Sequence, residues 1–264
     1  MTNGRDYDSM AFGVEPGLPP YRLRQARYQA LAEDVAQHAG QHFRRTGRKL
    51  DLLDVGVGDG VSMRYLEVNA GAEHICYHGV DLFPKGIKKV YKLELWQLQQ
   101  VDLENGMPAV DSTRYDLVIC EQVLEHLVEC ERGLAELTRV LRPGGTLIVG
   151  VPIFAHGVHH LRSQLVRTLK LAKPRGHVQS FSQRSFLQLL HKTNVLEVQE
   201  VRGFRIVSGG ILRPLENFRW WWQLNRRVGA AVPSLCVEIQ VIARKKALPA
   251  QTALSAQITL RRAA

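Results

Sequence analysis

A glycine-rich turn between a predicted strand and a predicted helix constrains this chain most strongly. The apolar run Leu50–Leu53, with Val55 after it, predicts a buried strand, and Val61–Val68 predicts the helix that follows. Between them the sequence reads DVGVGDG, from Asp54 to Gly60. Glycines at such a place let the backbone turn sharply and let a ligand lie against the main chain. The sequence therefore predicts a small-molecule site at a strand–turn–helix unit.

The spacing of the glycines argues against a dinucleotide as that ligand. In the fingerprint G-x-G-x-x-G, counted from Gly56, the third glycine would stand where this chain has Val61. Here an acid, Asp54, precedes three alternating glycines, which are Gly56, Gly58 and Gly60. This pattern favours a ligand without phosphates at the turn.

Segments that read as strands alternate with segments that read as helices. The expected strands are 50–55, 77–82, 95–103, 115–120, 146–151, 195–201 and 236–243. The expected helices are 21–45, 61–68, 129–141 and 182–193. The sequence Arg142-Pro-Gly-Gly145 is a strong stop signal after the third of these helices, so the fifth strand is expected to begin at Thr146. Such alternation predicts an α/β fold with a parallel sheet and helices on both faces.

Acidic residues stand at the ends of the predicted strands. Asp81 ends the second strand, where a carboxylate can accept hydrogen bonds from both hydroxyls of a ribose. Asp102 ends the third strand and is followed by Leu103, a pair that suits the amino group and the ring of an adenine. The fourth strand ends at Glu121-Gln122. Open parallel sheets bind ligands at the edge where the carboxyl ends of the strands lie, so these side chains are expected to surround one ligand.

Five blocks between Leu50 and Pro152 resemble the core of the class I S-adenosylmethionine-dependent methyltransferases. They read LDLLDVGVGDG, YHGVDLFP, VDLENGMP, YDLVICEQVLEHL and LRPGGTLIVGVP, in the order and spacing of that family. The resemblance implies a seven-stranded, mostly parallel, doubly wound Rossmann-like sheet with a helical cap inserted after strand 5. It also implies S-adenosyl-L-methionine as cofactor. Val57 stands where the family commonly has a cysteine, a side chain that is not needed for binding.

The same resemblance implies a role for each residue of the predicted cofactor site. Asp54, Gly56, Gly58 and Gly60 would hold the amino-acid end of the cofactor, Asp81 with Leu82 the ribose, Asp102 with Leu103 the adenine, and Glu121 with Gln122 the floor near the sulfonium. We expect residues 21–246 to form the methyltransferase domain, with the cofactor core at 50–152 and the substrate cap and C-terminal strands at 153–246. Residues 1–20 are expected to be a flexible leader and 247–264 a loose tail.

Histidines near the strand ends are the candidate catalytic residues. Methyl transfer is an in-line displacement, in which a hydroxyl acceptor also needs a base. His126 follows the fourth strand, in a Glu-His pair. His177 lies in a segment that resembles one in small-molecule and sugar-modifying members of the family, where it brings a histidine over the methyl group. The alternative for His126 is a residue that packs against or caps the start of a helix. The alternative for His177 is a loop residue without a role in the reaction. His156, His159 and His160 have metal-like spacing but no nearby carboxylate, so we expect pocket lining and no metal.

Positive charge is concentrated in the second half of the chain. The net charge is +10, and from His156 onward 18 Lys and Arg stand against four Asp and Glu. One explanation is an anionic partner, such as a phosphorylated substrate, a nucleic acid or a membrane surface. The other is that the protein is simply basic, without such a partner. His160–Arg175 is basic and amphipathic, and Arg219–Arg227 holds three tryptophans between arginines. The segment with the tryptophans could lie at a membrane surface, could stack on bases or sugars, or could form a lid over the pocket.

The acceptor is the part of the function that the sequence leaves open. The stretch from Arg202 to Leu235 more loosely resembles methyltransferases of cell-surface polysaccharide and lipid-linked glycan pathways. We therefore expect O-methylation of a sugar, a cell-surface glycan or a lipid-linked small molecule. The alternatives are a quinone or natural-product methyltransferase, an RNA-binding or RNA-modifying protein, and a non-catalytic partner subunit. No RNA-binding module is recognisable, so no specific nucleic acid is predicted.

The expected location is the cytoplasm, with peripheral contact at the inner face of the membrane. Four scattered cysteines without CxxC spacing indicate reduced thiols. No apolar run approaches the roughly 18 residues of a spanning helix.

Overall fold

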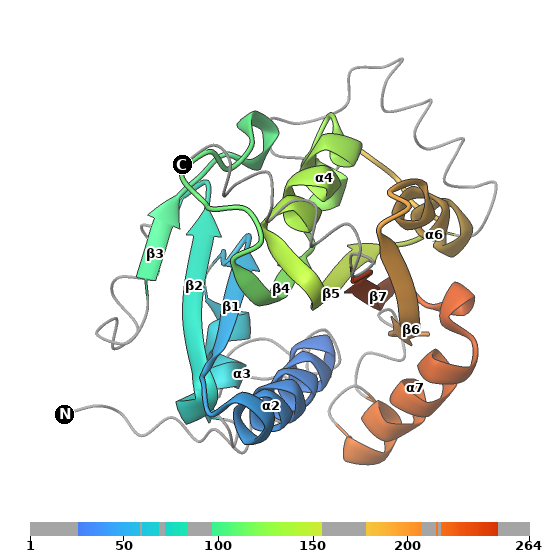
Figure 1. The fold of residues 1–264 in the computed structure, drawn as a ribbon. Coiled ribbons are helices and arrows are strands. Elements are labelled where there is room, and N and C mark those ends of the chain that lie inside the picture. The colour runs from blue at the N-terminus through green and yellow to red at the C-terminus, as the bar shows by residue number, and fades with distance from the viewer. Residues whose placement is uncertain are drawn as a thin grey trace, which may run out of the picture.

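A single sheet of seven strands organises the described part of the chain (Figure 1). The computed structural model describes residues 26–58, 60–68, 72–83, 97–154, 178–206, 215 and 218–247. The strand order is β3-β2-β1-β4-β5-β7-β6. The bounds are β1 Leu50–Val55, β2 Ile75–Asp81, β3 Gln97–Gln100, β4 Tyr115–Glu121, β5 Leu141–Pro152, β6 Leu196–Phe204 and β7 Glu238–Lys245. Strand β7 is antiparallel to β5 and β6, and the other pairs are parallel, which confirms the predicted mostly parallel sheet.

Helices cover both faces of the sheet, as predicted. On one face lie α2 (Ala26–Thr46) and α3 (Val61–Val68), and on the other lie α4 (Cys130–Val140) and α6 (Gln183–Lys192) (Figure 1). Alternate residues of a strand point to opposite faces. In β4 this sends Leu117 and Ile119 toward α2 and α3, and Val118 and Cys120 toward α4 and α6. Both sets are fully buried, which explains why the strand is apolar without alternation.

Helix α7 (Arg219–Ala231) is an element that the sequence analysis did not expect. It packs beside β6, and the Asn225 side chain accepts a hydrogen bond from the Ile206 backbone nitrogen at 3.0 Å. Trp221 and Trp222 are partly buried against Ala26, at the start of α2. The side of α7 that faces the protein includes the buried Asn225 and Gly229. Because neither residue is apolar, the inner face gave no clear helical period.

Several strand boundaries differ from the predicted ones, and the start of β5 and the end of β3 bear on the site. Strand β5 begins at Leu141, and the predicted start at Thr146 is wrong, because Arg142–Gly145 runs as the first part of the strand. Leu141 pairs with Tyr115 across an irregularity in the β4–β5 register, a place where proline and glycine are tolerated. Strand β3 ends at Gln100, short of the predicted end at residue 103, and a 3-10 helix follows at Leu103–Asn105.

Three predicted segments lie outside the described residues. These are the leader at 1–20, the helical cap, of which 155–177 is not described, and the tail from 248 onward. Among the described residues, none of the helices combines the length and the apolar character that crossing a membrane requires.

Gly229 and Gly40 give a matched pair of glycines inside helices. A Cβ at Gly229 would overlap the backbone carbonyl of Gly203 in β6, whereas one at Gly40 in α2 would meet only the end of the Arg44 side chain at 3.5 Å. We expect Gly229→Ala to lower the free energy of unfolding by roughly 1–3 kcal/mol, because α7 must move off β6. Gly40→Ala should raise it by up to about 1 kcal/mol through helix propensity.

Urea unfolding of both variants tests this close packing of α7 on β6. Equal effects of the two substitutions would contradict it.

Candidate active site

The glycine turn has the backbone shape that the sequence predicted. Gly56, Gly58 and Gly60 have φ angles of 82°, 58° and 77°, which residues with a Cβ rarely adopt. Gly56 donates its backbone N–H to the Val80 carbonyl at 2.8 Å, and a Cβ on Gly56 would overlap Val123. The turn therefore lies closely between the end of β2 and the loop after β4.

Asp54 braces the turn from inside the protein. Its Oδ2 accepts hydrogen bonds from Ser62 Oγ at 2.5 Å and Tyr77 OH at 2.8 Å, and the residue is only 2% exposed. Burial raises the pKa of the Asp54 carboxyl to about 6, although both hydrogen bonds lower it. These contacts tie β1 and β2 to the first turn of α3. The predicted contact of Asp54 with the cofactor stays a prediction.

Asp81 joins the end of β2 to the glycine turn. Its Oδ2 accepts the backbone N–H of Gly58 at 2.7 Å, and its Oδ1 accepts the backbone N–H of Phe83 at 2.7 Å. Leu82 and Phe83 are exposed beside it. The carboxylate thus lies at the turn and, as the sequence predicted, at the end of β2. Its contact with a ribose stays a prediction.

Asp102 and Leu103 begin a 3-10 helix at the same edge of the sheet. Asp102 caps this helix, accepting the Glu104 backbone N–H at 3.0 Å and the Asn105 side-chain amide at 2.9 Å. The prediction that Asp102 ends a strand is wrong, because β3 ends two residues earlier. Leu103 is 6% exposed and belongs to the core, so only a small part of its side chain is open to a ligand.

Gln122 has a strained backbone at the end of β4. Its φ is 58°, and its N–H donates to the Gly150 carbonyl at 2.9 Å. A residue with a Cβ adopts such a φ at a cost of order 1–3 kcal/mol, and such strain is concentrated at ligand sites. This strained position directly follows the strand end at which the sequence placed the floor of the cofactor site.

Glu121 points into a buried polar cluster rather than toward an open floor. Its carboxylate accepts a hydrogen bond from Gln240 Nε2 at 2.9 Å and lies 3.5 Å from Arg27 Nε. Burial raises the pKa of Glu121 to about 7, against the effect of Arg27. The carboxylate is therefore engaged by α2 and β7. A direct role for it near the sulfonium stays a prediction.

Three charged residues of this cluster were missed from the sequence, namely Arg27, Arg205 and Glu238. Glu238 pairs with Arg27 through the Arg27 Nη1 atom and with Arg205 through Arg205 Nε at 3.0 Å. In the sheet register Glu238 lies opposite both Pro152 and Phe204, the last residues of β5 and β6. The cluster therefore lies at the carboxyl edge of the sheet, which is the edge where the parallel strands end. Glu238 and Gln240 alternate with apolar residues in a buried strand, a signal that could have revealed them.

Glu125 is the second missed carboxyl group and lies in the 3-10 helix Leu124–His126. It is fully buried, and neither of its carboxylate oxygens has a hydrogen-bond partner among the described residues. Burial raises the pKa of Glu125 to about 8, so the carboxyl group is mostly protonated at neutral pH. A buried, unpartnered carboxyl beside a predicted catalytic residue is a typical feature of a functional site.

His126 lies on the exposed side of the same turn. Its side chain is 36% exposed, and its Nε2 lies 3.9 Å from Glu125 Oε1. The Glu125 carbonyl accepts the backbone N–H groups of Val178 and Gln179, both at 2.8 Å. The chain that returns after residue 177 is thus fixed on the His126 turn.

The other histidines singled out in the sequence lie outside the described residues. These are His177 and the group His156, His159 and His160. Within the described ranges, no group of three or more metal-ligating side chains comes together.

The buried Glu125 gives a prediction about stability and pH. In the folded protein its pKa is about 8, against an ordinary value of 4.5, so the folded state holds a proton that the unfolded state releases. Its contribution to stability is therefore complete below about pH 4.5 and falls as the pH rises toward 8. Because glutamine stays neutral, Glu125→Gln should gain stability relative to the wild type across this range, by at most about 1.4 kcal/mol per pH unit.

Urea unfolding over that pH range measures the difference. Glu129→Gln, at an exposed position nearby, is the control and should follow the wild type. A difference between Glu125→Gln and wild type that is the same at every pH would contradict the assignment.

Comparison with known proteins agrees with this geometry. A methyltransferase domain family matches residues 23–200, which is more than half of the chain. A probable S-adenosylmethionine-dependent methyltransferase of Mycolicibacterium smegmatis is 25% identical over 81% of this chain and 81% of its own length. A ubiquinone biosynthesis O-methyltransferase of Rickettsia akari is 23% identical over 49% of each chain, so the present chain spans about half of that relative.

A solved structure shows the same fold. The S-adenosylmethionine-dependent methyltransferase from Mesorhizobium loti superposes with a TM-score of 0.55 at 16% identity, covering 84% of this chain and all of that one. The glycine turn, the acid at the end of β2, the strand order and the family match together lead to one assignment. The chain belongs to the class I S-adenosylmethionine-dependent methyltransferases.

Proposed function

We propose that this methyltransferase methylates a hydroxyl oxygen of a lipid-linked small molecule. The observation that carries the proposal is an exposed apolar surface at the start of α7, formed by Phe218 just before the helix and by Trp220 and Leu224 within it, which are 51%, 54% and 45% exposed. Trp220 and Leu224 lie one helical turn apart and so share a face. Arg227 on the same helix is also exposed. Tryptophan and leucine beside arginine are typical of a helix at a membrane surface.

The three tryptophans of this segment have different surroundings. Trp220 is exposed, whereas Trp221 and Trp222 are half-buried against Ala26, Ala30 and Phe204. Phe204 is the last residue of β6 and lies at the carboxyl edge of the sheet. The apolar surface of α7 therefore begins close to the edge at which the cofactor turn lies. An acceptor held in a membrane could reach that edge while its lipid part stays on the α7 surface.

A base near the cofactor turn fits a hydroxyl acceptor. When bound, the cofactor supplies an electrophilic methyl group. The chain must orient the acceptor and take the proton that the hydroxyl loses as its oxygen attacks. His126 has a partly exposed ring on the turn that follows Gln122, so we assign that proton to its imidazole. His177 is the second candidate, since Val178, the residue after it, is hydrogen-bonded to the His126 turn.

Two classes of lipid-linked acceptor fit this proposal. A sugar or cell-surface glycan on a lipid carrier agrees with the loose resemblance of residues 202–235 and with the basic second half of the chain. A polyprenylated phenol agrees with the Rickettsia akari relative, which is an O-methyltransferase of ubiquinone biosynthesis. Both would place the enzyme at the surface of a membrane, in peripheral contact with it.

A labelled-methyl assay with matched acceptors tests the proposal. The protein is incubated with methyl-labelled S-adenosylmethionine and with a polyprenyl-linked sugar, a polyprenyl catechol, and the same sugar and catechol without the lipid. We expect label on one lipid-linked hydroxyl, at least about tenfold faster than on its lipid-free counterpart, because the α7 surface contributes binding energy. Asp81→Ala should bind S-adenosylmethionine at least about tenfold more weakly, since it loses the carboxylate at the turn.

Two controls separate the parts of this proposal. Asp111→Ala removes an exposed carboxylate far from the turn and should leave cofactor binding unchanged. His126→Gln should lower kcat with little change in KM, and His177→Gln measures the second candidate. Label that appears only on amines or on RNA would overturn the proposed acceptor while leaving the methyltransferase assignment intact.

A further inference from the structure

A cavity of about 520 Å³ lies at the opposite edge of the sheet from the glycine turn. Its walls are the starts of β1, β4 and β5, the end of β7 and the last turns of α2. Strands β1 and β4 begin at this edge and end at the carboxyl edge, so the length of the sheet separates the cavity from the cofactor site. The volume is in the range of small-molecule sites.

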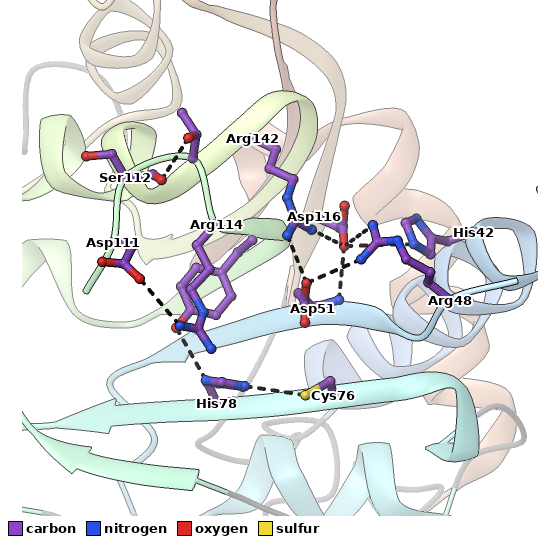
Figure 2. Close-up of polar contacts among 12 residues, drawn as sticks. His42, Arg48, Asp51, Cys76, His78, Asp111, Ser112, Arg114, Asp116 and Arg142 are labelled. Carbon is purple, nitrogen blue, oxygen red and sulfur yellow. Dashed lines mark hydrogen bonds and ion pairs between the residues drawn. The ribbon is translucent and has the colours of Figure 1, made fainter. Parts of the chain in front are cut away.

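Arginines dominate the charged lining of this cavity. Arg45, Arg142 and Arg244 line it together with a single carboxylate, that of Asp116. Figure 2 shows that Arg142 is already neutralised, since its Nη1 lies 2.6 Å from Asp116 Oδ2 and its Nη2 lies 3.0 Å from Asp51 Oδ2. Arg48 approaches the same two carboxylates at 3.8 and 3.9 Å. These four residues balance one another and leave the charges of Arg45 and Arg244 uncompensated.

Arg45 and Arg244 form no ion pair within the part of the chain that is described. Arg244 Nε donates a hydrogen bond of 3.2 Å to the Gly144 carbonyl, which holds the guanidinium at the cavity wall. Glu197 lies opposite Arg244 in the β6–β7 register, yet no ion pair joins the two. The cavity therefore presents two guanidinium groups whose charge the protein does not neutralise.

His42 also lines the cavity, although its Nε2 atom is buried within the protein and does not face the open space. The residue is 7% exposed, and its Nε2 has no hydrogen-bond partner among the described residues. The nearest carboxylate oxygen, Asp116 Oδ2, is 3.9 Å away, which is too far for a hydrogen bond (Figure 2). A buried polar atom without a partner costs about 1–3 kcal/mol, so such atoms call for an explanation.

We infer that this cavity is a second binding site, which takes the phosphate group of a small molecule. A dianionic phosphate matches the two uncompensated guanidinium groups, whose planar forks suit phosphate oxygens. His42 lines the same cavity. The walls at Leu50, Leu117 and Ile242 are apolar and suit an uncharged remainder of the ligand.

Calorimetric titration with inorganic pyrophosphate tests the site in the full chain. We expect saturable one-to-one binding by the wild type, and affinity at least about tenfold lower for the double variant Arg45→Gln/Arg244→Gln. Arg184→Gln, an exposed position on α6 at the other face of the sheet, should bind as the wild type does. Asp81→Ala should also bind pyrophosphate normally, which separates this site from the cofactor turn.

The result that would overturn the inference is absent binding, or equal weakening by the Arg184→Gln and the double variant. A second readout is the NMR signal of the His42 ring, which should shift on addition of pyrophosphate and should not shift in the double variant. Competition then identifies the source of the phosphate. Displacement of pyrophosphate by phosphatidylglycerol vesicles indicates a lipid headgroup, and displacement by a soluble sugar phosphate alone indicates a metabolite. Both outcomes support the site.

Discussion

Arg27 lies buried between two carboxylates, those of Glu121 and Glu238, and so joins three elements of the fold with one guanidinium group. Glu121 ends β4 and Glu238 begins β7, while Arg27 belongs to the first turn of α2. A charge without a partner in such a place would cost several kcal/mol, so the three side chains are stable only together. Arg205 adds a second positive group to Glu238 from the end of β6.

This cluster fixes the geometry of the carboxyl edge. Strand β7 runs antiparallel between β5 and β6, which brings its first residues to the edge where its neighbours end. Glu238 can therefore meet Arg27 only if β7 is inserted in this direction. The polar cluster and the strand order depend on each other. The strained Gln122 and the fully buried Glu125 stand one and four residues after Glu121, so the position of Glu121 constrains both.

Helix α2 touches both ends of the sheet. Its first turn carries Arg27 at the carboxyl edge, and its last turns carry His42 and Arg45 at the opposite edge. A helix of 21 residues is about 30 Å long, which is enough to span the sheet. The helix is also bound along its length, through Asp34 to Arg202 at 2.6 Å in β6. Movement of α2 at one end would thus strain contacts at the other.

The glycine turn and the acid at the end of β2 could be predicted from sequence because their signals are local. The turn from Gly56 to Gly60 needs particular backbone angles, and Asp81 acts through its place at a strand end. Both features depend on neighbours in the chain. Seven strands and the two covered faces followed from apolar runs in the same way. These patterns set which residues meet at the carboxyl edge, but not which of them turn inward.

The polar cluster could not be predicted, because its members come from distant parts of the chain. Arg27 and Glu238 are separated by 211 positions, and only the insertion of β7 brings them together. Glu121 was predicted at the correct strand end, but its contacts with Arg27 and Gln240 could not be foreseen for the same reason. Helix α7 was missed because its inner face includes Asn225 and Gly229. In each case the missing information was a tertiary contact.

The glycine turn is held independently of the chain that follows β5. The turn, Asp54 and Asp81 are held by short hydrogen bonds within β1, β2 and α3, and none of these contacts involves the chain after β5. After β5, the Phe154 backbone N–H donates to the Phe181 carbonyl, and the backbone N–H groups of Val178 and Gln179 donate to the Glu125 carbonyl. Both points of attachment are next to the His126 turn. The contacts that shape the glycine turn are thus separate from those that attach the chain after β5, as expected of a fold that carries different sites on one framework.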